Sequence, residues 1–208
     1  MSIKSGVTSG TPKHLTFGAG LLFQGVTYSE SVAPTEEAIK TGLIGATADG
    51  ITFTFTPEFY APELDGVYVD VKELQRKIGE TAEIEASVAE ITPEMIAHQV
   101  VGTISNSTDT KYDVVTSSML GTGHFYSGFG FYSELFDGRP FIILFKNAQC
   151  ISGLPLDNKN KESGAVKSKF KCYSDLEYGT DKLPYAIFIH KETGWTAATL
   201  ADIDNRTP

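Results

Sequence analysis

The chain contains very little cysteine, with two residues, Cys150 and Cys172, among 208. This count excludes the disulfide framework that holds many small secreted proteins together. Each cysteine follows an alternating apolar run, so we expect two buried free thiols; a bridge between neighbouring strands is the alternative. A chain of this length buries roughly 70% of the surface that its unfolded form exposes, which is enough to fold without cross-links.

Long apolar runs are also missing. No stretch reaches the ~18 apolar residues typical of a membrane-spanning helix, so we expect no contact with a membrane. The N-terminal segment Met1–Leu15 lacks the apolar core of a secretory signal. We therefore expect the chain to fold in the cytoplasm where it is made, or to leave by a route that the sequence does not display.

Basic residues are fewer than acidic ones. The chain has 17 Lys and Arg and 26 Asp and Glu, which gives a formal net charge of −9. A protein that grips nucleic acid through its phosphates needs a basic surface, and this balance argues against that class. The balance is compatible with a protein that nucleic acid must pass without sticking.

Motifs for chemistry are absent as well. The four histidines stand far apart, without the neighbours that a zinc site needs, at His14, His98, His124 and His190. The glycines of "GTGHFYSG" have the wrong spacing for a dinucleotide loop, and no nucleophile elbow occurs. We predict no catalytic residue, cofactor or metal, and hence a protein that is not an enzyme.

Alternation of apolar and polar residues is what the sequence does contain. It predicts half-buried strands over Gly50–Glu58 and Glu80–Ile91. The polar positions on these strands include Thr52 and Thr54 in the first and Glu83 and Glu85 in the second. Further strands are expected over Val67–Gly79, Lys111–Leu120, Arg139–Gly153, Ser163–Asp175 and Leu183–Lys191. Asp65 and Gly66 form a turn signal.

Glu83 and Glu85 allow three interpretations. Two carboxylates on one strand face could act as a general acid and base. They could also belong to an ordinary solvated face, or to an acidic lining that repels phosphate. Lys167, Lys169 and Lys171 alternate in the same way, and are either solvated or partners for acid on a neighbouring subunit.

One helix has clear signals. Thr92 can cap it, Pro93 fits its first position, and Gly102 can end it in the left-handed conformation. Its apolar stripe consists of Met95, Ile96 and Val100, and His98 is expected on the polar side. A single helical turn is expected within Pro34–Gly42, whereas the aromatic, glycine-rich Gly121–Gly138 reads as a long loop or irregular hairpin.

These elements predict a mainly β fold, an antiparallel β-sandwich or barrel with one flanking α-helix, because strands and helices do not alternate. We expect a single domain over residues 1–208. Residues 1–13 are small and polar and form an N-terminal arm, and residues 192–208 form a C-terminal tail.

The order of these elements resembles the major tail tube proteins of long-tailed, non-contractile bacteriophages. The resemblance rests on "LIGATADGITFTFTPE", "LDGVYVDVKEL" and "ETAEIEASVAEITPEMIAHQVVG", which lie within Gly42–Gly102, and on the later strand pair Phe145–Asp175. It covers about two-thirds of the chain. The segment Gly121–Gly138 and the C-terminal tail have no counterpart in it.

The resemblance implies a structural virion protein that assembles into stacked hexameric rings. These rings would form the tail tube through which DNA is ejected, with DNA passing the lumen without specific binding. The implied partners are further copies of the chain, the tape measure protein, the tail terminator and the distal tail protein. Residues 42–66 and the N-terminal arm are the implied inter-ring contacts.

Candidate residues follow from this resemblance and from the strand and helix patterns. The candidate lumen-facing polar residues are Glu83, Glu85, Thr52 and Thr54. The candidate assembly residues are Thr92, Met95, Ile96, Val100, Asp65 and Gly66. Alternatives are another tube-like component, such as a type VI secretion-like tube or a tail-completion protein, or a β-barrel carbohydrate-binding or hydrolytic protein that uses Glu83 and Glu85.

Overall fold

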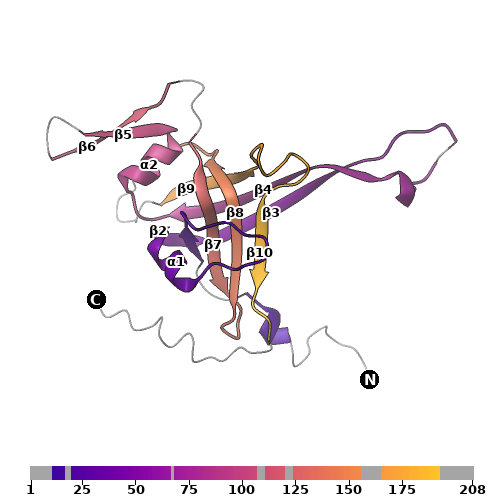
Figure 1. The fold of residues 1–208 in the computed structure, drawn as a ribbon, viewed down its shortest axis with the longest axis horizontal. Helices are drawn as coiled ribbons and strands as arrows, with labels where there is room; N and C mark the ends of the chain where they lie inside the picture. The colour runs from indigo at the N-terminus through magenta and orange to yellow at the C-terminus, as the bar shows by residue number, and fades with distance from the viewer. Residues whose placement is uncertain are drawn as a thin grey trace.

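The computed structural model describes residues 11–16, 20–66, 68–106, 111–119, 124–155 and 165–192. It is mainly β, with a barrel-like antiparallel sheet that nearly closes on itself (Figure 1). Across the sheet the strands are β2 (Leu43–Gly45), β1 (Leu21–Phe23), β7 (Tyr126–Glu134), β8 (Pro140–Cys150), β9 (Val166–Tyr173), β4 (Arg76–Val88) and β3 (Thr47–Tyr60). The predicted fold class is confirmed.

Strand β8 pairs with two different strands, one after the other, along one of its edges. Its residues Phe141–Phe145 pair with β10 (Tyr185–Ile189), and its residues Asn147–Cys150 pair with β9. The two ends of the sheet come close together, because β2 and β3 are separated by one residue and Thr47 Oγ1 donates a hydrogen bond to the Gly20 carbonyl at 2.8 Å. The sheet therefore nearly encloses a central core.

The core lies inside the barrel. Phe129, Phe145, Phe170 and Ile84 are fully buried there, and the rings of Phe129 and Phe170 are 4.4 Å apart. Burial of each such side chain contributes about 1.5–3 kcal/mol relative to exposure, so these residues carry much of the stability.

A second apolar cluster covers the outer face of β7 and β8. Alternate residues of a strand point to opposite faces, so Tyr132 and Leu144 lie outside the barrel. They pack with Phe23 and with Ile39 of helix α1 (Glu36–Thr41), whose N-cap Thr35 accepts a hydrogen bond from the Ala38 amide. Helix α1 lies within the helical turn predicted for Pro34–Gly42.

Of the two expectations for Gly121–Gly138, a long loop or an irregular hairpin, the long loop is wrong, because residues 126–134 form the central strand β7, which pairs with β8 as a hairpin. It is buried on both faces, so its residues show no apolar–polar alternation. Its glycines permit close backbone approach: a Cβ on Gly130 would lie 2.2 Å from the Ile143 carbonyl oxygen, and one on Gly128 1.6 Å from that of Val26. The glycines that suggested a loop allow this strand to pack.

The strand predicted over Val67–Gly79 is largely wrong as well. The described residues of this region, 61–66 and 68–75, form an irregular connection with one 3-10 turn, η2 (Lys72–Leu74), and β4 begins at Arg76. Val69 is exposed, and Val67 lies outside the described residues. Among the described residues, no strand lies beside this segment to offer a hydrogen-bonding edge, so apolar–polar alternation alone did not produce a strand.

Helix α2 (Pro93–Gln99) begins as predicted. Thr92 Oγ1 accepts a hydrogen bond from the Met95 amide at 3.2 Å, and Pro93 takes the first position. The predicted end is wrong, because Val101 adopts the left-handed conformation, with φ 50°, and Gly102 begins β5 (Gly102–Asn106). A Cβ on Gly102 would lie 2.6 Å from the Thr116 carbonyl oxygen in β6 (Asp113–Ser117), so close strand pairing explains this glycine.

Candidate assembly surfaces

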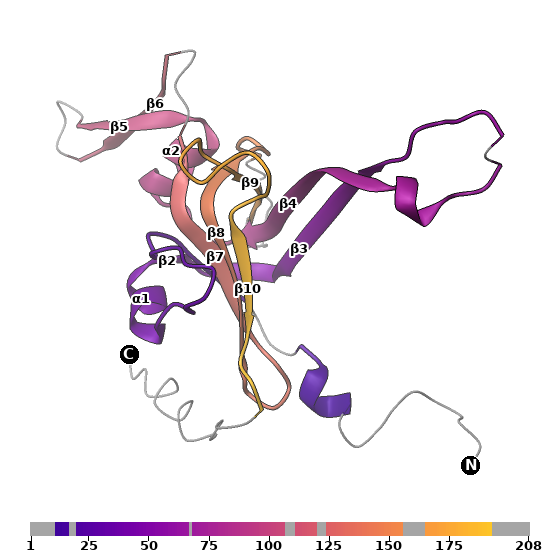
Figure 2. The ribbon, with the colours of Figure 1, turned by 45° about the vertical axis from the view of Figure 1, so that its right-hand side comes forward.

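A long hairpin leaves the barrel. Strands β3 and β4 extend far beyond their neighbours and project to one side in both views (Figure 1, Figure 2). Residues alternate between half-buried and exposed as far as Pro57, and beyond it both strands are exposed on either face. We call residues 58–79 the arm and residues 61–75 its tip. Asp65 and Gly66 lie in the tip, where Gly66 has φ 86°.

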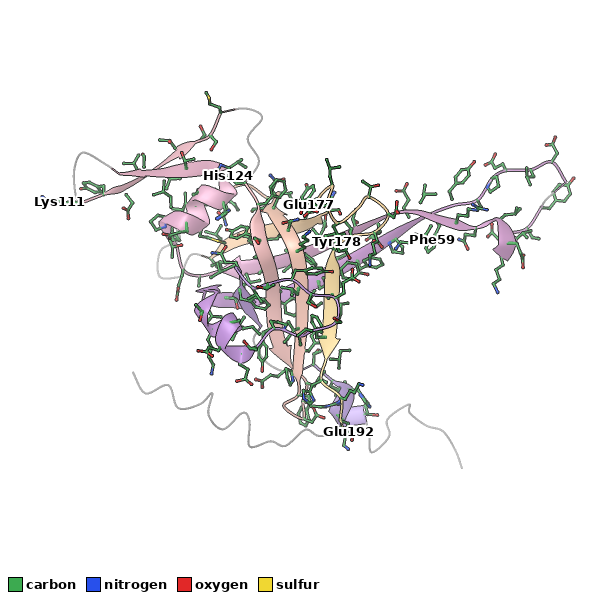
Figure 3. All side chains as sticks on the ribbon, in the orientation of Figure 1. Phe59, Lys111, His124, Glu177, Tyr178 and Glu192 are labelled. Atoms are coloured by element: carbon green, nitrogen blue, oxygen red, sulfur yellow. The ribbon has the colours of Figure 1, made fainter. Side chains whose placement is uncertain are left out.

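The arm carries large apolar side chains in contact with solvent. Tyr68 is 94% exposed and Val69 is 75% exposed. Other exposed large apolar residues of the arm are Phe59, Tyr60, Leu64 and Ile78. Phe59 lies where the hairpin departs from the barrel (Figure 3). Such a concentration of exposed apolar groups marks an interaction surface.

The root of the arm is fixed to the barrel. Glu80 Oε1 accepts a hydrogen bond from the Leu183 amide at 2.6 Å, and Glu80 forms an ion pair with Lys77. The Lys77 ammonium lies 5.5 Å from the centre of the Phe55 ring, and Phe55 contacts Tyr185 of β10. These contacts direct the hairpin away from the body.

All four candidate lumen-facing residues share one sheet face. In the register of β3 with β4, Thr52 lies opposite Glu85 and Thr54 lies opposite Glu83. The opposite face of β4 carries Ala82 and Ile84 in the core, so these polar residues lie on the outside of the barrel. We call this surface the polar face.

Strand β9 adds lysines to the polar face. Lys171 lies opposite Glu83 and Lys169 lies opposite Glu85. Lys169 Nζ is 2.8 Å from Glu83 Oε2, and this hydrogen bond and charge raise the pKa of Lys169. Lys169 therefore meets acid from its own subunit, and Glu83 has the environment of an ion pair on an open face.

Helix α2 packs against one end of the barrel. Met95 joins the core and accepts a hydrogen bond from the Tyr126 hydroxyl at 3.8 Å. Gln99, which sequence analysis did not single out, is buried and donates from Nε2 to Ser168 Oγ at 2.5 Å. Ile96 and Val100 of the predicted stripe are only half-buried. A buried polar residue at a helix end gives no apolar signal, which is why the pattern missed Gln99.

His98 does not lie on a polar side as expected. Its ring stacks on Tyr126 with centroids 3.6 Å apart, and its Nδ1 is buried without a hydrogen-bond partner among the described residues. Burial lowers the pKa of His98, and the charge of nearby His124 acts in the same direction. The helix is rotated relative to the predicted stripe, because Met95 and Gln99 face the barrel.

Three strands of the large sheet have only one partner strand in the described part of the chain. Strand β3, with 14 residues, pairs only with β4, β10 pairs only with β8, and the short β2 pairs only with β1. Unpaired backbone groups of an edge strand are a template for another chain. The hairpin of β5 and β6 is a second projection, which packs on α2 and has Lys111 near its end (Figure 3).

Both terminal segments are held at the end of the barrel away from α2, where Glu192 lies near η1 (Thr11–His14) (Figure 3). Arg139 is 4% exposed, and its Nη1 donates to the His190 carbonyl at 3.0 Å. Lys13 and Glu192 form an ion pair beside it. Residues 1–10 and 193–208 lie outside the described residues. They contain most of the predicted N-terminal arm (residues 1–13) and of the predicted C-terminal tail (residues 192–208).

The remaining candidates for chemistry are metal-binding groups and the two cysteines. The described residues contain no group of His, Cys, Asp and Glu that could hold a metal ion. Cys150 and Cys172 are buried and unpaired, and burial raises the pKa of Cys172 to about 12. None of the helices in the described ranges has the length and apolar character needed to pass through a bilayer.

Comparisons with known proteins add little. No protein-family model and no curated protein sequence matches this chain. A solved structure described as "Virion of native gene transfer agent (GTA) particle" contains a similar chain, with a TM-score of 0.39 and 9% identity. The match covers 89% of this chain and 100% of that chain. Because the TM-score is this low, nothing about the assembly of that particle is carried over to this chain.

Proposed function

We propose that this chain is a structural subunit of a phage tail tube, which assembles into hexameric rings that stack around a channel for DNA. The observation that carries the proposal is the arm, a projecting hairpin with exposed apolar residues at its tip. A two-stranded hairpin is marginally stable in water by itself. A second copy that covers the arm would stabilise it and bury its apolar side chains.

The energetics of the arm favour such an interface. Full burial of one large apolar side chain contributes about 1.5–3 kcal/mol. Tyr68, Val69 and Leu64 together could therefore offset much of the cost of association. The resemblance implied inter-ring contacts at residues 42–66 and at the N-terminal residues 1–13. We propose that residues 58–79, which include Asp65 and Gly66, make the contact of the first kind.

The unpaired edges and the polar face support a ring. Pairing of β3 or β10 with a strand of a neighbouring copy would satisfy their open backbone groups. The polar face carries Thr52, Thr54, Glu83 and Glu85 beside lysines and lies outside the core, so it could line a channel for DNA. In this arrangement α2 completes the core of each subunit, with Thr92 and Met95 fixing its position.

The double substitution Tyr68→Ser and Val69→Ser tests the arm. Both residues are exposed, so unfolding of the monomer should change by less than about 0.5 kcal/mol. Sedimentation velocity should show an assembly midpoint at least about tenfold higher in concentration, because two apolar anchors are lost. Leu176→Ser is the matched control, because Leu176 is 91% exposed but lies outside the arm.

Equal assembly of the double variant and the control would contradict the role of the arm. A wild-type chain that stays monomeric at about millimolar concentration would contradict the tube itself. Single rings that never stack would favour a tail-completion protein, whereas helical polymers would support a tube.

A further inference from the structure

Three lysines follow the polar face of β9. Lys167, Lys169 and Lys171 occupy alternate positions, so neighbouring lysines are about 6.7 Å apart along the strand. This separation equals about two axial phosphate steps of 3.4 Å along one DNA strand. Cations at such a spacing on an open sheet face suit a phosphate backbone. We call these residues the lysine stripe.

Two of the three residues of β4 that lie opposite the lysine stripe are glutamates. Glu83 lies opposite Lys171, and Glu85 lies opposite Lys169. The Lys169 ammonium reaches diagonally to Glu83 at 2.8 Å. The third position differs, because Lys167 lies opposite the uncharged Ser87.

The outer neighbours add no charge. Thr52 and Thr54 lie beyond the two glutamates in the register of β3 with β4. On the other side of β9, Gln149 lies opposite Lys171. Glu83 and Glu85 are therefore the acids that directly border the lysine stripe in this register.

We infer that the lysine stripe would bind phosphate if Glu83 and Glu85 did not neutralise most of its charge. With the glutamates in place, the polar face contacts nucleic acid without retaining it. A face with lysines alone would bind phosphate, and a face with acid alone would repel DNA strongly. Three lysines beside two glutamates leave one net positive charge, so this face neither binds phosphate firmly nor repels it strongly. The inference rests on the proposed function only in naming DNA as the polyanion; the binding itself is a property of one subunit.

The test is DNA binding by the full chain with Glu83→Gln and Glu85→Gln. Fluorescence anisotropy with a 20-base-pair duplex at about 20 mM salt should show affinity about tenfold above wild type, since released lysines can displace counterions. The logarithm of the binding constant should fall against the logarithm of salt with a slope of about −2.7, as three phosphate contacts predict.

Two further variants control for net charge. Glu36→Gln with Glu37→Gln on α1 removes the same two charges, and Glu36 also lies within 4.0 Å of a lysine, Lys40. This variant should bind as weakly as wild type. Addition of Lys169→Gln and Lys171→Gln to the first variant should abolish the gain.

Equal binding by the two glutamine variants would overturn the inference, because net charge alone would then explain any gain. A gain that survives removal of the lysines would also overturn it. If the double variant does not fold, Glu85→Gln alone decides, because Glu85 is exposed, and it should bind about threefold more tightly than wild type. Ring formation is scored separately by electron microscopy, so absence of rings would count against the proposed function and leave the binding result standing.

Discussion

Arg139 donates a hydrogen bond from Nη2 to the carbonyl oxygen of Lys13 at 2.6 Å, across 126 positions of sequence. The same guanidinium donates to the His190 carbonyl and forms an ion pair with Asp137 at 2.7 Å. One buried side chain therefore joins the segments that lead to the N-terminus and the C-terminus. Both terminal segments depart from the same end of the barrel as a consequence.

Replacement of Arg139 by Met should cost about 3 kcal/mol of unfolding free energy. It removes three charge-assisted hydrogen bonds and leaves the Asp137 carboxylate without its cationic partner, with the backbone amide of residue 139 as its remaining donor there. Urea unfolding measures the loss, and limited proteolysis should show faster cleavage near residues 11–16. Arg76→Met, at an exposed position of the arm, is the control and should change stability by less than about 0.5 kcal/mol. Equal losses in the two variants would refute this role.

His98 should make stability depend on pH. Its pKa in the folded protein is lowered, first by burial and then by His124. Below the unfolded pKa of about 6.5 the unfolded chain binds the proton more readily, so stability is full above that pH and decreases as pH falls towards the folded pKa. Thermal unfolding of His98→Gln between pH 7.5 and 5 should show a flatter profile than wild type. Parallel profiles would contradict the assignment.

Gly130 should tolerate no side chain. Gly130→Ala places a methyl group against the Ile143 carbonyl at 2.2 Å and against Phe23, and should cost at least about 2 kcal/mol. Gly79→Ala is a matched control, because the added Cβ meets only the end of the flexible Glu58 side chain, at 2.9 Å. Chemical denaturation of both variants should separate them clearly, and similar midpoints would show that β7 adapts more easily than the packing suggests.

Met95 and Ile96 should differ in their contributions to stability. Met95 is buried in the core, so Met95→Ala should cost about 2–5 kcal/mol, whereas the half-buried Ile96 should cost less when replaced by Ala. Urea unfolding of the two variants reports which helix face is inward. A larger loss for Ile96→Ala would mean that the helix presents its predicted stripe to the barrel.

Local signals predicted much of this fold. Alternation located β3 and β4, and the Thr92 cap with Pro93 located the start of α2, because these features depend on near neighbours in sequence. Strand β7 was not predicted, because its burial on both faces removes the apolar–polar alternation and its glycines are also typical of loops.

The candidate surfaces depended on register, which the sequence does not display. The alternation placed Glu83 and Glu85 on one strand face and the lysines on another. Only the pairing of β4 with β9 puts Lys169 beside Glu83. The length of the arm was hidden for a similar reason, because its tip has valine alternation typical of a strand but no strand to pair with.

Negative-stain electron microscopy of the purified full chain, at increasing concentration, tests whether the chain forms a tube. A tail tube subunit should give polymers whose power spectrum shows a regular axial repeat, together with end-on views of six-fold rings around an open centre. Folded monomers alone at the highest attainable concentration, with neither rings nor polymers, would contradict the proposed tube.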